Sequence, residues 1–174
     1  MSLPILDAGH ALLRPLAVSD ASALHGAYTD PEVCRYLPRP VHARLEETEA
    51  AIARHIASGS NWAIVDATRG AEGDAIGEIG LFPGRWPAVL EVGILLARGA
   101  WGRGLAGAAL NTVVAYGFGP LDAHRLFADV DPENAASLRL FEHAGFAREG
   151  LLRHTWRTHL GLRDSVILAR LREP

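Results

Sequence analysis

The chain contains no lysine and a single cysteine, and each shortage narrows what the protein can be. Arginine supplies all 17 positive charges against 20 acidic residues, and the net charge of −3 gives no electrostatic reason to expect nucleic-acid or membrane-surface binding. A lone Cys34 excludes an intrachain disulfide, and we expect it to be a small buried apolar residue.

Long apolar segments are also missing. No run approaches the ~20 residues that a membrane helix needs. Residues 1–7 lack the charged and apolar regions of a signal peptide, so we expect a soluble cytoplasmic protein. The eight histidines show no His-Glu-x-x-His spacing, and we expect no metal site. There is no Gly-x-Ser-x-Gly turn of the serine hydrolases either.

What is present is a chain of 174 residues, 49% hydrophobic and 21% charged, which indicates one globular domain over residues 1–174. Apolar periodicity and turn residues predict an α/β fold. We expect strands over His10–Pro15, Asn61–Asp66, Ala75–Phe82, Val89–Leu96 and Arg125–Val130, and two more around a turn near Gly161. We expect helices over Ser19–Tyr28, from Asp30 to before Pro38, over Leu45–Ile56, from Leu105 to Pro120 and from Asp131 to Ala144. Successive strands before residue 98 favour a meander with one later βαβ crossover.

The glycine-rich turn from Arg98 to Ala106 is the most informative segment. A predicted strand leads into Gly99, Gly102 and Gly104, and a predicted helix begins at Leu105. Glycine allows the backbone to approach a ligand closely, and the first N–H groups of a helix favour an anion. The turn is therefore expected to hold a phosphate group, unless it is an ordinary glycine-rich connection.

Three phosphate ligands compete for this turn. A nucleotide P-loop requires a lysine and is excluded. The stretch Gly102-Arg103-Gly104-Leu105-Ala106-Gly107 matches the dinucleotide pattern Gly-x-Gly-x-x-Gly, but that pattern should open a series of βαβ units, which the predicted meander does not provide. The third ligand is the pyrophosphate of an acyl-CoA.

Two motifs resemble the GCN5-related N-acetyltransferase (GNAT) superfamily. The first is Glu91-Val92-Gly93-Ile94-Leu95-Leu96 followed by Trp101-Gly102-Arg103-Gly104-Leu105-Ala106. The second runs from Asp131 to Phe146, with an Asn, a Ser three residues later and a closing Gly-Phe. Leu12-Leu13-Arg14-Pro15-Leu16 and the stretch from Gly150 to Arg153 resemble the RimJ/RimL-type branch, which acetylates ribosomal-protein N-termini.

The resemblance covers nearly the whole chain and implies the GNAT fold: a mixed, mostly antiparallel central sheet with a splayed parallel pair and helices on both faces. It implies acetyl-CoA as co-substrate, with pantetheine in the gap between the splayed strands and pyrophosphate on the backbone of the glycine turn. Arg98 and Arg103 would add charge, since Gly99 stands where the family usually has Gln or Arg. The cofactor-binding residues implied are Ile94, Leu95, Leu96, Arg98, Gly99, Trp101, Gly102, Arg103, Gly104, Leu105, Ala106, Asn134, Ser137 and Phe141.

The resemblance also implies the catalytic groups. A carboxylate helps remove a proton from the attacking amine, and Glu91 is our first choice, Asp129 the second and Glu78 the third. Many family members carry a Tyr at the position of Phe141, which has no donor for the departing thiolate. Ser137 or a bound water is then the candidate acid. Asn134 and Ser137 have an alternative role, which is only to satisfy first-turn donors of their helix.

The acceptor expected from this branch is the α-amine of a protein or peptide N-terminus, in a pocket formed by the first two helices and the last hairpin. A small-molecule amine such as an antibiotic or polyamine is the alternative substrate. A third possibility is a sensor that binds acyl-CoA without catalysis. We expect no nucleic-acid or membrane partner, and either a monomer or a homodimer.

Overall fold

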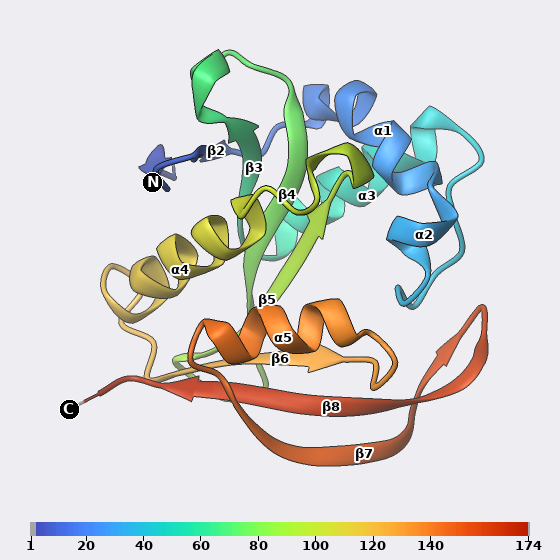
Figure 1. Ribbon diagram of the computed structural model, residues 1–174, viewed down its shortest axis with the longest axis vertical. Helices are drawn as coiled ribbons and strands as arrows, with labels where there is room; N and C mark the ends of the chain where they lie inside the picture. The colour runs from blue at the N-terminus through green and yellow to red at the C-terminus, as the bar shows by residue number, and fades with distance from the viewer. Residues whose placement is uncertain (1–2, 174) are drawn as a thin grey trace.

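The computed structural model describes residues 3–173, and within them the strands form one mixed sheet flanked by helices (Figure 1). The strands are β1 Leu6–Asp7, β2 Ala11–Pro15, β3 Ser60–Asp66, β4 Ala75–Pro83, β5 Val89–Leu96, β6 Arg125–Val130, β7 Ala147–Thr158 and β8 Gly161–Leu171. The helices are α1 Ala21–Thr29, α2 Pro31–Cys34, α3 Leu45–Ser58, α4 Leu105–Phe118 and α5 Ala135–His143, with 3₁₀ turns at Val18–Asp20, Ala67–Arg69 and Arg98–Ala100.

Among the described residues the sheet has eight strands in the order β1-β2-β3-β4-β5-β6-β8-β7. Strands β2 to β5 lie side by side as the predicted antiparallel meander, and the unpredicted β1 pairs antiparallel with β2. Strand β6 pairs with β5 in parallel after the α4 crossover, and the β7–β8 hairpin continues the sheet antiparallel to β6. This order is not that of a doubly wound dinucleotide-binding domain, which removes the Gly-x-Gly-x-x-Gly interpretation.

Successive residues of a strand point to opposite faces of the sheet, and apolar side chains occur on both faces. Helices therefore cover both faces. Trp62 and Ile64 of β3 belong to the core beneath α4 and α5, whereas Ala63 belongs to the core beneath α1 and α3. Figure 1 shows α4 and α5 on one side of the sheet and α1, α2 and α3 on the other. No helix within residues 3–173 is both long and apolar enough to cross a bilayer.

Two elements differ from the sequence-based expectation. The short strand β1 has only two residues, which is too few to show a period. Helix α5 begins at Ala135 rather than at Asp131, because a side-chain oxygen of Asp131 accepts the N–H of Glu133 at 2.8 Å in a turn that precedes the helix. Asn134 is the residue that caps α5.

Candidate active site

The parallel strands β5 and β6 separate part-way along their length. They pair only from Val89 and Arg125 to Glu91 and Phe127. Beyond that point β5 continues against β4 and β6 continues against β8, so the facing edges part. A cavity of about 1040 Å³ lies at the opening, and it is lined by parts of β5 and β6, the α2 segment, the glycine turn, the start of α5 and the β7–β8 hairpin.

The glycine turn forms one wall of this cavity. Gly102 and Gly104 have φ of +72° and +75°, a left-handed conformation that favours glycine. Gly104 is also the N-cap of α4, and no side chain caps the first turn of that helix. The N–H groups at the start of α4 are thus available to an anion, and the helix dipole favours negative charge there.

The structure brings together most residues expected around the cofactor. Those that line the cavity are Ile94, Leu95, Leu96, Trp101, Gly102, Gly104, Leu105, Ala106, Asn134, Ser137 and Phe141. The Trp101 indole N–H donates to the carbonyl of Leu96 at 2.8 Å, which fixes the ring across the base of the turn. Arg98, Gly99 and Arg103 are outside the lining.

Arg103 points to a different part of the molecule. Its guanidinium forms an ion pair with Asp66 at the end of β3, beside a separate cavity of about 390 Å³. Hydrogen bonds from Thr68 and Arg103 lower the pKa of Asp66 to about 2. In this conformation the charge of Arg103 is directed to Asp66 and away from the large cavity.

The start of α5 forms the wall opposite the glycine turn. The side-chain oxygen of Asn134 accepts the N–H of Ser137 at 3.1 Å, which is an N-cap hydrogen bond. The capping role that the sequence left open for Asn134 is therefore present. Ser137 is half-buried and lines the cavity together with Asn134.

Glu91 and Asp129 lie on the same face of the splayed pair, because Glu91 is in register with Phe127 and side chains alternate along β6. Both line the cavity. Burial and then the negative charge of Asp129 raise the pKa of Glu91. Asp129 accepts the Trp156 indole N–H at 2.9 Å on one oxygen and the Ser165 hydroxyl on the other. A carboxylate whose pKa is raised, in a cavity beside a second negative charge, is a better proton acceptor than an ordinary carboxylate.

The comparisons with known proteins agree with this geometry. The profile of the acetyltransferase (GNAT) domain family matches residues 10–147. The uncharacterized N-acetyltransferase YoaA of Bacillus subtilis is 31% identical over 156 residues, or 86% of each chain. The chain belongs to the GNAT acetyltransferase family.

Two further matches show proteins that resemble this GNAT chain, one in sequence and one in structure. A spermidine N(1)-acetyltransferase of Vibrio cholerae is 26% identical over 141 residues, or 80% of each chain. The crystal structure of a GNAT-family acetyltransferase from Bacillus anthracis superimposes with a TM-score of 0.86, covering 97% of this chain and 98% of that one at 24% identity. The second match concerns the fold alone.

Acetyl-CoA is the acyl donor of the GNAT family, and the cavity has the features that such a donor requires. The glycine turn offers backbone N–H groups to a pyrophosphate, and the parted edge of β5 offers backbone groups to an extended chain. Within residues 3–173 no group of three or more His, Cys, Asp or Glu side chains is placed to hold a metal ion.

The positions of Phe141 and Glu78 limit what each residue can contribute to catalysis. Phe141 is buried and packs edge-to-face on Phe146, with ring centroids 5.1 Å apart. Glu78 is outside the cavity lining; it accepts the Tyr28 hydroxyl and lies 3.1 Å from Nδ1 of His55. The third-choice base of the sequence analysis is thus enclosed between α1, α3 and β4.

Several cavity residues were missed from the sequence. Tyr36 follows α2, and Trp156 and Arg163 are register partners on the β7–β8 hairpin. Of the two helices and the hairpin expected around the acceptor, α2 and the β7–β8 hairpin line this cavity, whereas α1 does not. Without known pairing between the hairpin strands, no signal singled out Trp156 and Arg163, and no motif marked Tyr36.

Proposed function

We propose that this GNAT domain transfers the acetyl group of acetyl-CoA to the α-amine at the N-terminus of a protein or peptide. The observation that carries the proposal is the single cavity shared by the glycine turn and the Glu91–Asp129 pair. The turn would hold the pyrophosphate, and β5 and the start of α5 would hold the pantetheine. The two carboxylates stand on the opposite, acceptor side of the splayed strands.

Glu91 is the proposed general base. An ammonium has no lone pair, so the acceptor must lose a proton before its nitrogen attacks the acetyl carbonyl. Glu91 takes that proton directly or through a water, and Asp129 keeps the surroundings negative. The C–S bond then breaks, and the CoA thiolate receives a proton from Ser137 or a water because Phe141 has no donor.

The carboxylates on the acceptor side suit any amine, and Arg35 is the charge that favours a peptide over a polyamine. Glu32, Glu91, Asp129 and Asp164 line the cavity and attract an ammonium group. Arg35 lines the same cavity, and it would oppose the second and third ammonium groups of a polyamine. A peptide carries one ammonium followed by carbonyl groups that accept from a guanidinium. The spermidine N(1)-acetyltransferase relative favours the polyamine as the second candidate.

The acceptor is tested by following CoA thiol release with a panel of N-terminal peptides, spermidine and other small amines. Release with peptides supports the proposal. Release with small amines alone replaces the peptide by the second candidate. Tight acetyl-CoA binding without release of the CoA thiol in the presence of any acceptor would overturn the proposed acetyl transfer. It would favour a sensor that binds acyl-CoA.

The base is tested by Glu91→Gln, which keeps the shape of the side chain and removes the proton acceptor. We expect kcat to fall ~10²-fold or more, the usual scale for a general base. Acetyl-CoA affinity, measured by calorimetry, should be unchanged. Near-normal turnover of the variant across a pH series rules Glu91 out.

A further inference from the structure

The β7–β8 hairpin extends beyond the sheet at the acceptor side of the cavity. Strand β8 pairs with β6 only from Leu171 to Val166, so residues 152–165 project past the last β6 pair. Figure 1 shows this projecting end below α2. It carries Trp156, Thr158, Arg163 and Asp164, all of which line the cavity.

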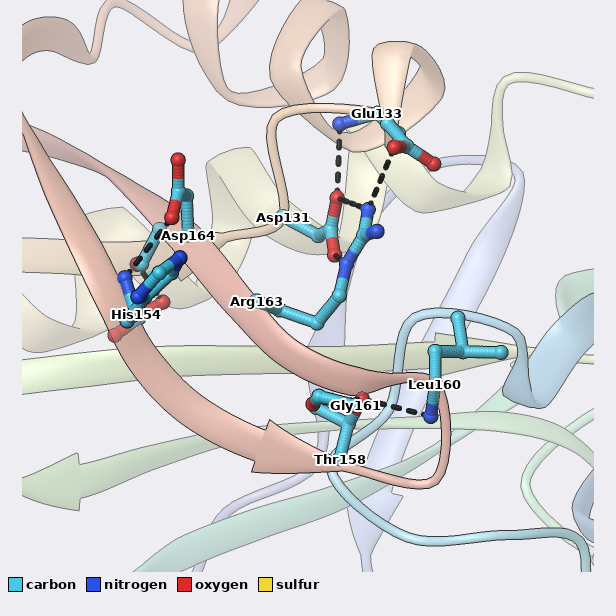
Figure 2. A network of polar contacts seen from close by, with 10 residues as sticks. Asp131, Glu133, His154, Thr158, Leu160, Gly161, Arg163 and Asp164 are labelled. Carbon is cyan, nitrogen blue, oxygen red and sulfur yellow. Dashed lines mark hydrogen bonds and ion pairs between the residues drawn. The ribbon is translucent and has the colours of Figure 1, made fainter.

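This projecting end is attached to one short segment. Within residues 3–173, every side-chain hydrogen bond or ion pair from residues 152–165 to the rest of the chain ends on residues 129–133. Trp156 and Ser165 bond Asp129. Arg163 bonds Asp131 and Glu133, and Figure 2 shows its guanidinium between the two carboxylates.

Arg163 has the most complete of these attachments. Its Nε donates to one oxygen of Asp131 at 2.8 Å, and Nη2 donates to the other at 2.9 Å. Nη2 also lies 2.9 Å from Oε1 of Glu133. The Asp131 side chain is only 7% exposed, so its charge depends on this bidentate partner. Burial opposes the charge of Asp131, but the bonds from Arg163 and the Glu133 N–H outweigh it and lower its pKa.

Asp131 in turn shapes the start of α5. Its Oδ1 accepts the N–H of Glu133 at 2.8 Å, and its carbonyl accepts the N–H of Asn134 at 2.9 Å. Asn134, which caps α5, comes three residues after Asp131, and Ser137 is one turn further along the helix. A displacement of Asp131 therefore moves the two residues assigned to the acyl-CoA.

We propose that Arg163 is a positioning residue that couples the acyl-CoA side of the cavity to its acceptor wall. CoA bound against Asn134 and Ser137 makes the 131–133 turn less mobile. Because Arg163 is bonded to this turn, the projecting hairpin becomes less mobile as well. The hairpin then holds Trp156 and Asp129 in place for the acceptor. This inference rests on the proposed roles of Asn134 and Ser137.

The test compares Arg163→Met with Arg148→Met. Arg148 on β7 joins the same hairpin to α5, through Glu142 at 2.6 Å, but neither Arg148 nor Glu142 lines the cavity. We expect Arg163→Met to lower kcat about tenfold or more, because misplaced reacting groups cost rate. Its CoA dissociation constant should rise by a smaller factor than kcat falls, because the glycine turn stays intact while only Asn134 and Ser137 are displaced. Arg148→Met should leave kcat unchanged. Arg163→Lys keeps the charge without the bidentate fork and should lie between wild type and Arg163→Met.

Hydrogen exchange gives a readout that needs no acceptor. CoA should slow exchange in residues 131–137 and 154–164 of the wild type, but only in residues 131–137 of Arg163→Met. If Arg163→Met does not fold, the same loss of coupling is measured on Arg163→Lys. The proposal is overturned by equal kcat losses in Arg148→Met and Arg163→Met, or by a wild-type hairpin that CoA does not protect. If no acceptor is turned over, the proposed function fails while the exchange result still decides the role of Arg163.

Discussion

Glu91 and Asp129 stand on neighbouring strands where β5 and β6 part, and the negative charge of Asp129 acts on Glu91. Asp129 has a donor on each oxygen, from Trp156 and Ser165, and so has little freedom to turn away. Two carboxylates in one cavity with different surroundings can divide the work of proton transfer between them. Glu91, whose pKa is raised, is the group that we propose as the base.

Asp129→Asn tests this division of roles at the level of one charge. The variant removes a negative charge that raises the pKa of Glu91, so that pKa should fall. A base works above its pKa, and the acidic limb of kcat/KM should therefore move to lower pH. The measurement is a pH profile with a peptide acceptor. Glu32→Gln removes a charge from the same cavity and serves as the control. A limb that stays fixed or moves to higher pH contradicts the assignment.

The position of a residue in the site could be predicted from the sequence where the residue is part of a motif. It could not be predicted where it depends on a contact with a residue far away in the chain. Glu91, Asn134 and Ser137 were named from motif position, and all three line the cavity. Arg103 was expected beside the phosphate, but its partner Asp66 lies 37 residues earlier in the chain. No local pattern reveals a partner at that separation.

The glycine turn shows how a single element can be specified by backbone conformation. Gly102 and Gly104 occupy the left-handed region, whereas Gly99 does not. A Cβ added at any of the three would meet no heavy atom within 4 Å. The difference between these glycines is therefore conformational and not steric.

Gly104→Ala and Gly99→Ala form a matched pair for this element. The left-handed conformation costs a residue with a Cβ about 1–2 kcal/mol, so Gly104→Ala should lower the free energy of unfolding by about 1 kcal/mol. It should also weaken CoA binding, because the N-cap of α4 must shift. Gly99→Ala should leave stability nearly unchanged. Urea denaturation and calorimetry with CoA measure both effects, and equal stability losses in the two variants would contradict this account.

At the same scale, the sequence predicted most helices and strands because periodicity and turn residues are local properties. The start of α5 was misplaced because the side chain of Asp131 closes a turn over the N–H of Glu133, and in the sequence this pattern looks the same as a helix N-cap. The splay between β5 and β6 came only through family resemblance. It depends on where pairing between strands about 36 residues apart stops, and periodicity within either strand does not contain that information.

Across the whole molecule, the carboxylates of the acceptor side differ from those elsewhere: their surroundings suit proton transfer but lower the stability of the fold. Ion pairs such as Arg14–Asp20 at 2.6 Å and Arg125–Glu149 at 2.5 Å lie elsewhere and satisfy their carboxylates. Hydrogen bonds from Arg125 lower the pKa of Glu149, so folding favours the charged form of that group. Glu91 behaves in the opposite way, because burial and Asp129 raise its pKa. The ionisation of Glu91 thus opposes folding.

Glu91→Gln should consequently make the protein more stable at neutral pH while it removes activity. The folded-state pKa of Glu91 lies above its unfolded value, so stability is lost as pH rises from the unfolded to the folded pKa. Below both values the carboxyl is protonated in either state and the variant gains nothing. We expect Tm to rise by on the order of 1–2 °C at pH 7.5 and to match wild type at pH 4. Glu49→Gln, at an exposed position on α3, controls for the change in net charge. A gain of equal size at both pH values, or a loss at pH 7.5, would show that ionised Glu91 does not strain the fold.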